Sequence, residues 1–314
     1  THRRTHGGEW RAGRGGGGPQ SDRGVAAVSL EVNSIPLIPM ARGEAAKEGV
    51  RLYWLGQAGF LIDFHDSRIV IDAYLSDSLN KKYRGTRFPH ERMMPPPVPP
   101  DGISDVDWVA STHGHTDHMD PETLAPLFEA NPEARYLVPI AELDRALARG
   151  GPEGRTVGVD AGEAIALSPA VMATALPAAH EEEELDDAGR HRFLGFLFRG
   201  EDVSIYHSGD TVPFDGLIKR LELEKPHLAL LPVNGRDEER RSHGVPGNMT
   251  LEEAVEFLST GLVGEVLGHY FGLFDFNTVD LESAERDVST LPERLRSRVQ
   301  LAALGKEYWL GGET

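Results

Sequence analysis

The residues best suited to chemistry lie in one short segment, THGHTDH at positions 112–118. His113, His115, Asp117 and His118 place three imidazoles and one carboxylate within six residues, a group that is costly to bury without partners. Zinc-like ions bind histidine nitrogen at about 2.0–2.1 Å in nearly tetrahedral shells. A tight loop can direct the alternate histidines at one ion and the adjacent Asp and His at another, so the spacing indicates two neighbouring metal ions. The alternative is an exposed loop that happens to be rich in histidine.

Three further candidates follow predicted strands downstream: His180, Asp210 and His269. A single histidine after a strand is more often a surface or hydrogen-bonded residue than a ligand. In this order, however, the three residues form a set that supplies the additional ligands required by two ions. Gly209 lets the backbone turn before Asp210, whose carboxylate could bridge both ions.

The elements that must position these residues are mostly short strands bounded by turn residues. Strands are predicted at 51–55, 60–64, 68–73, 107–112, 135–140, 163–167, 171–176, 193–198, 203–207, 227–233 and 265–269. Helices are predicted at 121–130, 141–149, 214–222 and 251–262, the last opened by the capping box of Thr250 and Glu253. Strands outnumber helices and interleave with them late in the chain. The pattern therefore predicts an α/β fold of two sheets packed face to face with helices outside.

Residues 76–100 break this pattern, because they carry five cations and end in the proline-rich run PPPVPP. Such a run forms neither a helix nor a central strand, so a long surface loop is expected here. A lid over a site and a plain connector are both consistent with its length.

Composition excludes several classes of protein. The 314 residues are 39% hydrophobic, carry a net charge of −18 and include no cysteine. The charge opposes nucleic-acid or anionic-lipid binding through a broad basic surface. Absence of cysteine excludes disulfides, thiolate nucleophiles and cysteine metal sites, so any metal must bind His and carboxylates. No apolar run approaches the ~20 residues that span a membrane. We therefore expect no nucleic-acid or membrane partner.

The chain is expected to contain a disordered Gly/Arg-rich tail, residues 1–28, and one domain, residues 29–314. The apolar stretch 25–41 is interrupted by Glu31, Pro36 and Pro39, which argues against a signal peptide. A cytoplasmic location is the corresponding expectation.

The ordered motifs resemble the metallo-β-lactamase-fold hydrolases from roughly Arg51 to the C-terminus. The resemblance implies an αββα sandwich with two mixed sheets. It also implies that His113, His115 and His180 hold one metal, that Asp117, His118 and His269 hold a second, and that Asp210 bridges them. Five phrases are similar to the branch of L-ascorbate-6-phosphate lactonase, which is manganese-associated and hydrolytic: WLGQAGF at 54–60, YHSGDT at 206–211, LPVNGR at 231–236, GNM at 247–249 and HY at 269–270.

Two divalent ions, manganese or zinc, would make a bridging hydroxide available near neutral pH, because metals lower the pKa of bound water from 15.7 to about 7. Asp117 would orient that nucleophile and move its proton. Asn234, Arg236, Asn248 and Tyr270 are the candidate substrate-binding residues. The charged stretch after Arg236 fits a solvated surface loop equally well.

The first functional hypothesis is a dinuclear metal-dependent hydrolase of a small, anionic lactone or ester. A phosphodiesterase acting on a nucleotide or phospholipid head group is the alternative, because the same metal pair serves in-line displacement. A metal-binding regulatory protein without catalysis is the third, and the complete set of seven ligands speaks against it. The sequence leaves open whether the protein forms a homo-oligomer.

Overall fold

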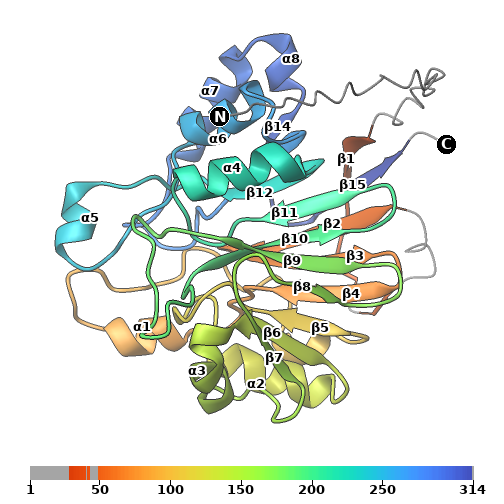
Figure 1. Ribbon diagram of the computed structural model, residues 1–314. Helices are drawn as coiled ribbons and strands as arrows, with labels where there is room; N and C mark the ends of the chain where they lie inside the picture. The colour runs from red at the N-terminus through yellow and green to blue at the C-terminus, as the bar shows by residue number, and fades with distance from the viewer. Residues whose placement is uncertain (1–27, 40, 43–48, 313–314) are drawn as a thin grey trace, which may run out of the picture.

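The computed structural model describes residues 28–39, 41–42 and 49–312. The predicted tail, residues 1–28, lies outside the described residues except for Val28, which begins the first strand. Two mixed sheets pack against each other with helices outside them (Figure 1), which confirms the predicted α/β sandwich. Among the described residues, no helix combines the length and the apolar character needed to cross a membrane.

The first sheet has eight strands in the order β1-β15-β2-β3-β4-β5-β6-β7. Neighbours from β1 to β4 pair antiparallel, and those from β4 to β7 pair parallel. Its strands are β1 (Val28–Ser34), β2 (Val50–Gly56), β3 (Gly59–Phe64), β4 (Ser67–Ile71), β5 (Trp108–Ala110), β6 (Arg135–Pro139), β7 (Thr156–Val159) and β15 (Lys306–Gly312). The strands β1, β7 and β15 had no counterpart among the predicted elements.

The second sheet has seven strands in the order β14-β13-β12-β11-β10-β9-β8. Strands β11 to β14 run parallel, and β8 to β11 form an antiparallel meander. Its strands are β8 (Ala164–Ala166), β9 (Met172–Pro177), β10 (Leu194–Arg199), β11 (Ser204–His207), β12 (Leu228–Pro232), β13 (Glu265–His269) and β14 (Val299–Leu301). All except β14 match a predicted strand.

Side-chain alternation along β3 shows how the first sheet is buried on both faces. Phe60 and Ile62 belong to a core cluster that also contains Phe196 of the second sheet. Leu61, between them in sequence, belongs to a second cluster with Leu127 of helix α2. Because successive strand residues point to opposite faces, one face of β3 packs on the second sheet and the other on the outer helices.

Helices cover both outer faces of the sandwich (Figure 1): α4, α6, α7 and α8 lie on one side, and α2 and α3 on the other. The helices are α1 (Ser78–Tyr83), α2 (Pro121–Ala130), α3 (Leu143–Ala148), α4 (Asp215–Glu224), α5 (Glu238–Ser242), α6 (Leu251–Ser259), α7 (Leu281–Thr290) and α8 (Glu293–Arg296), with 3-10 turns η2 (Pro100–Gly102) and η3 (Ile140–Glu142). The predicted N-cap Asp120 and the capping box of Thr250 and Glu253 are both present.

The expectation of an uninterrupted loop over residues 76–100 is wrong at its beginning, where α1 forms. The Asp120 carboxylate accepts a hydrogen bond from the Ser78 hydroxyl, and the Arg92 guanidinium donates to the carbonyls of Tyr74 and Ser76. These long-range contacts hold a six-residue helix that its own sequence hardly favours. The proline-rich run itself contains no helix or strand longer than the turn η2.

Candidate functional site

The predicted ligands gather at one end of the sandwich because each follows a strand that ends there. The 113–118 loop leaves β5 of the first sheet, whereas His180, Asp210 and His269 follow or end β9, β11 and β13 of the second. Ligand sites in α/β folds commonly lie beyond the carboxyl ends of parallel strands. Here the strand ends of two sheets contribute to the same site.

Two short turns bring their ligands together by close backbone approach. In the 113–118 loop, the amides of His118 and Met119 both donate to the His115 carbonyl, at 3.2 and 2.9 Å. Gly209 has a φ of 62°, and a Cβ on it would lie 2.8 Å from the side chain of Thr112. Only glycine therefore lets the turn before Asp210 adopt this conformation and press against the residue that precedes His113.

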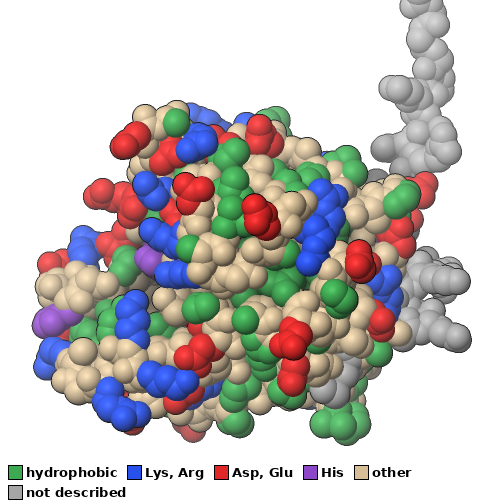
Figure 2. Space-filling model, turned by 90° about the horizontal axis from the view of Figure 1, so that it is seen from below, with side chains coloured by type: hydrophobic (Ala, Val, Ile, Leu, Met, Phe, Trp, Pro, Cys, Tyr) green, Lys and Arg blue, Asp and Glu red, His purple; other side chains and the backbone are tan. Residues whose placement is uncertain are grey.

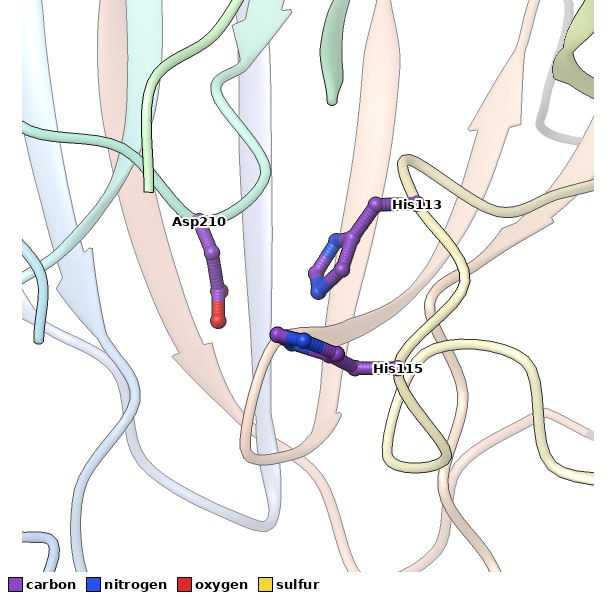
Figure 3. Close-up of side chains that lie close together, drawn as sticks. All are labelled: His113, His115 and Asp210. Carbon is purple, nitrogen blue, oxygen red and sulfur yellow. The ribbon is translucent and has the colours of Figure 1, made fainter. Parts of the chain in front are cut away.

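Ligand atoms of His113, His115 and Asp210 all lie within 4.8 Å of one another. Figure 3 shows the two imidazoles and the carboxylate pointing into the same space from two different loops. His180 adjoins this group: its Nε2 lies 3.5 Å from Oδ2 of Asp210, and its Nδ1 lies 3.0 Å from the Gly247 carbonyl, to which it can donate. These four residues can enclose one ion.

A second group shares Asp210 with the first. Nε2 of His118 lies 3.2 Å from Oδ1 of Asp210 and 3.7 Å from Oδ2 of Asp117. The His269 ring is fully buried, and Asp210 and His118 both influence its pKa, which burial lowers well below the usual value. Asp210 therefore faces histidines of both predicted sets.

The hydrogen bonding of this cluster fits divalent metal ions. Among the described residues, six buried atoms of the predicted ligands have no hydrogen-bond partner: Nε2 of His113, Nε2 of His118, both carboxylate oxygens of Asp210 and both ring nitrogens of His269. Leaving a buried polar group unsatisfied is costly, so these atoms need an explanation. His and Asp donors suit zinc, manganese and iron, and a set of seven is enough for two ions.

Charge coupling inside the cluster is strong. Burial raises the pKa of Asp210, but the neighbouring His118 and His180 reverse this and lower it well below the usual range. Burial lowers the pKa of His113 well below normal, and it lowers that of His115 to about 4, assisted by His180. His113 and His115 are therefore neutral and Asp210 is ionised at neutral pH, as metal ligands must be. Burial lowers the pKa of His118, but the carboxylates of Asp210, Asp72 and Asp117 outweigh it and raise that pKa well above the usual value, so a metal ion bound there would displace the proton of His118.

Several supporting residues were missed by the sequence analysis. The Asp72 carboxylate accepts from the Thr112 amide at 2.8 Å and the Thr112 hydroxyl at 2.6 Å, and its Oδ2 lies 2.9 Å from Nδ1 of His118. A carboxylate behind a ligating histidine fixes the ring and leaves the other nitrogen for the metal. Asp72 follows β4 directly, so its position after a strand was the available signal.

Gln57 was overlooked as a site residue, although it lies in one of the phrases that carried the resemblance. Its side-chain amide lies 3.2 Å from Oδ2 of Asp117, and the Tyr270 hydroxyl donates to the same oxygen over 2.7 Å. Tyr270 therefore lies at the site and lines the cavity beside it, and its role in binding substrate stays a prediction.

The other three predicted substrate residues are engaged elsewhere. The Arg236 guanidinium forms two hydrogen bonds with the Glu253 carboxylate, at 2.6 and 2.7 Å. Asn248 donates to the Asn234 side chain, which in turn donates to Asn277. This network stabilises the segment that leads to α5. The cavity beside the cluster is lined by other residues, and Asn234, Arg236 and Asn248 are not among them.

A cavity of about 660 Å³ opens beside the cluster. His115, Asp117, His180 and Tyr270 lie at one end, and its other walls come from α1 and the following loop, α3, and the segment after α5. Figure 2 shows a hollow near its left edge, with hydrophobic side chains inside it and several Lys and Arg side chains around it. The volume suits a small molecule.

Comparison with known proteins agrees with this geometry. The beta-lactamase superfamily domain matches residues 67–267, more than half of the chain. A metal-dependent hydrolase of Caldivirga maquilingensis is 29% identical over 184 residues, covering 59% of this chain and 70% of that protein. N-acyl-phosphatidylethanolamine-hydrolyzing phospholipase D 1 of Caenorhabditis elegans is 25% identical over 280 residues, covering 85% and 75%.

A similar fold occurs in the crystal structure of isothiocyanate hydrolase from Delia radicum gut bacteria, with a TM-score of 0.63 at 17% identity, covering 82% of this chain and 98% of that one. At this identity the likeness concerns the fold alone. The family match over residues 67–267 includes six of the seven clustered ligands. The chain is thus a member of the β-lactamase superfamily and an enzyme of its metal-dependent hydrolase class.

Proposed function

We propose that the chain hydrolyses a small anionic lactone or ester with two divalent metal ions, manganese or zinc. His113, His115 and His180 would hold one ion, Asp117, His118 and His269 the other, and Asp210 both. The observation that carries the proposal is the set of buried ligand atoms without hydrogen-bond partners around Asp210, next to a small-molecule cavity that His115, Asp117 and His180 line.

Bound divalent ions would supply a nucleophile at neutral pH by lowering the pKa of coordinated water to about 7, and would polarise the substrate oxygen. The chain's own contribution centres on Asp117. Burial raises the pKa of this carboxyl, but the charge of His118 lowers it below the ordinary value, so the group is ionised at neutral pH.

Two donors leave one Asp117 oxygen available. Tyr270 and Gln57 both donate to Oδ2, and among the described residues no donor contacts Oδ1. We assign Oδ1 as the atom that accepts the proton of the attacking water and returns it to the leaving oxygen. Tyr270 and Gln57 then act as positioning residues for this carboxylate.

A phosphodiesterase acting on a nucleotide or phospholipid head group is the second candidate. It is supported by the relative that hydrolyses N-acyl-phosphatidylethanolamine, since that likeness extends over 85% of this chain. A regulatory protein without catalysis is less consistent with the site, because such a protein has no use for buried, unpartnered ligand atoms.

One assay separates these candidates. Protein loaded with manganese or zinc is incubated with γ-butyrolactone, a phosphorylated sugar lactone, mono-4-nitrophenyl glutarate and bis-4-nitrophenyl phosphate, beside protein treated with a chelator. We expect metal-dependent turnover of the anionic lactone or ester that Asp117→Asn abolishes. Turnover of the phosphate diester alone would establish the second candidate, and full metal loading without turnover of any compound would favour the regulatory protein.

A further inference from the structure

Two arginines of the α3 region lie directly against the loop that carries the metal-site residues. Nη1 of Arg145 lies 3.3 Å from the Gly114 carbonyl, and Nη1 of Arg149 donates to the carbonyls of Gly114 and Met119 at 2.9 and 3.0 Å. A Cβ on Gly114 would overlap the Arg145 guanidinium. Glycine between the two metal-site histidines thus makes room for an arginine.

The positive charge in this place exceeds the negative charge. Glu142, which is 3% exposed, binds Arg145 at 2.9 Å through one oxygen and Arg192 at 2.8 Å through the other. Arg149 contacts backbone carbonyls instead of a carboxylate. Within the part of the chain that the structure describes, Glu142 is the one carboxylate that forms an ion pair with these three arginines, although the charge of Asp120 also acts on Arg149 and Asp117 lines the same cavity.

Arg145 retains donors for a ligand. Among the described residues, Arg145 forms its hydrogen bonds through Nη1 alone, and no acceptor contacts its Nε or Nη2. Its side chain is 46% exposed. The Nε and Nη2 edge of a guanidinium matches the two oxygens of a carboxylate or phosphate.

Both arginines line the same cavity as His115, Asp117 and His180. A molecule held at the predicted metal centre can therefore extend to Arg145 without leaving the cavity. Two other arginines are paired with carboxylates: Arg87, which lines the cavity, with Glu239, and the predicted substrate-binding residue Arg236 with Glu253.

We propose that Arg145, supported by Arg149, forms an anion subsite that binds a carboxylate or phosphate on the part of the substrate remote from the bond that is hydrolysed. This inference rests on the proposed hydrolase function and specifies its substrate class. In a chain with a net charge of −18, such a local excess of positive charge is what an anionic substrate requires. Lys82 is the rival contact, because it lines the same cavity and forms no ion pair among the described residues.

The test compares two esters with the same five-carbon acyl chain: mono-4-nitrophenyl glutarate, which ends in a carboxylate, and 4-nitrophenyl valerate, which does not. Arg145→Gln should raise KM for the glutarate ester about tenfold and change KM for the valerate ester much less, the pattern of a lost charge-assisted contact. Glu142 keeps Arg192 as a partner in this variant, so the fold should persist. Arg286→Gln removes an exposed charge on α7 and serves as the control for net charge.

Equal changes for the two esters would overturn the inference, and a larger effect of Lys82→Gln would move the subsite to α1. If the wild type hydrolyses neither these esters nor the lactones of the first assay, the proposed function fails but the subsite can still be tested. In that case, metal-loaded protein is titrated calorimetrically with glutarate and with inorganic phosphate. About tenfold weaker binding to Arg145→Gln than to Arg286→Gln would support the subsite, whereas equal affinities would place the anion on the metals and refute it.

Discussion

The Tyr270 hydroxyl donates a hydrogen bond to Oδ2 of Asp117 over 2.7 Å, although 153 residues separate the two in the chain. Gln57 donates to the same oxygen, and the Tyr270 amide donates to the Gln57 carbonyl at 3.1 Å. Both donors adopt positive φ angles, 71° for Tyr270 and 49° for Gln57. Non-glycine residues pay for such conformations, which are concentrated at functional sites. Both strained residues hold the Asp117 carboxylate in one position.

Tyr270→Phe should therefore reduce kcat about tenfold with little change in metal content, because it removes one hydrogen bond and keeps the ring beside His118. Burial raises the pKa of Asp117, whereas the His118 charge and the Tyr270 hydrogen bond lower it. Loss of the hydroxyl must raise this pKa, so the acid limb of the kcat profile should move to higher pH. Because the pKa of Asp117 in the wild type lies below the ordinary value of 3.8, turnover is measured from about pH 3 to pH 8. An acid limb at the wild-type position would contradict the role of Tyr270.

Asp210 and His207 lie three residues apart, but substitution of Asp210 should reduce metal content whereas substitution of His207 should reduce stability. Asp210 has two buried oxygens without hydrogen bonds, whereas the His207 ring contacts the Ala58 carbonyl at 2.8 Å and accepts from the Gly209 amide at 3.1 Å. We expect Asp210→Asn to lower metal content below one ion per chain while the chelated protein melts as before. His207→Ala should keep its metal and lose about 2–4 kcal/mol of unfolding free energy.

Elemental analysis and urea denaturation of the two variants provide the measurements. Metal loss in both variants, with both still folded, would contradict the assignment of Asp210 as a ligand and His207 as a structural residue.

The clustering of the predicted ligands could be anticipated from the sequence because they come from a dense local motif and from polar residues at or after the ends of strands. The residues around this cluster could not be anticipated, because their roles depend on contacts between distant segments. Asp72 follows a strand as the predicted ligands do. Its partners, however, are Thr112 and His118, which follow a different strand, β5. Arg145 lies in a short helix, and its position against Gly114 is visible only in the folded structure.

The same distinction explains the fold. Strands with clear alternation or apolar runs were predicted to within a few residues. Strand β15 was not predicted, although it pairs with both β1 and β2 and so joins the two ends of the described chain in one sheet. Helix α1 likewise depends on Asp120 and Arg92, which no local pattern links to it.

Asp72→Asn tests the support behind His118. The substitution conserves size but replaces one acceptor oxygen with a donor, in a buried position where both carboxylate oxygens are used. Metal affinity should fall about 10–100-fold, the usual effect of losing such a partner. Competition with a fluorescent chelator measures the affinity. Thr112→Ser keeps the hydroxyl that binds Asp72 and should remain close to the wild type; equal affinities of Asp72→Asn and the wild type would exclude this carboxylate from the metal site.

The ion pair between the loop after α1 and α5 should contribute little to substrate binding. Arg87, which lines the cavity, forms an ion pair with Glu239 of α5, but each side chain is 61% exposed. Exposed pairs are worth about 0–1 kcal/mol. Arg87→Gln should therefore change KM for an anionic ester less than about fivefold, and Glu239→Gln should do the same. Steady-state kinetics of both variants at low and high salt tests this, and a tenfold effect of Arg87→Gln alone would identify it as an anion contact.

Asp160 links the end of β7 in the first sheet to the segment before β10 in the second. Its Oδ1 accepts from the His191 amide at 3.0 Å and the Ala161 amide at 2.8 Å, and lies 2.8 Å from Nδ1 of His191. The loop between His180 and His191 is therefore fastened at its base by this carboxylate. Asp160→Asn should lower Tm by about 2 °C at neutral pH.

The pH dependence of this loss has a definite sign. Burial raises the pKa of Asp160, but the hydrogen bonds from His191 and Ala161 outweigh it and lower the pKa below 3.8. A carboxyl whose folded pKa is depressed stabilises the fold above its unfolded pKa and loses that contribution as the pH falls through the folded value. The difference in Tm between wild type and Asp160→Asn should thus be full at pH 7 and pH 5 and shrink below 3.8. Asp187→Asn, an exposed neighbour without a hydrogen bond or ion pair among the described residues, should show no difference at any pH. A difference in Tm between the wild type and Asp160→Asn that persists unchanged into strong acid would show that the charge of this carboxylate does not hold the loop.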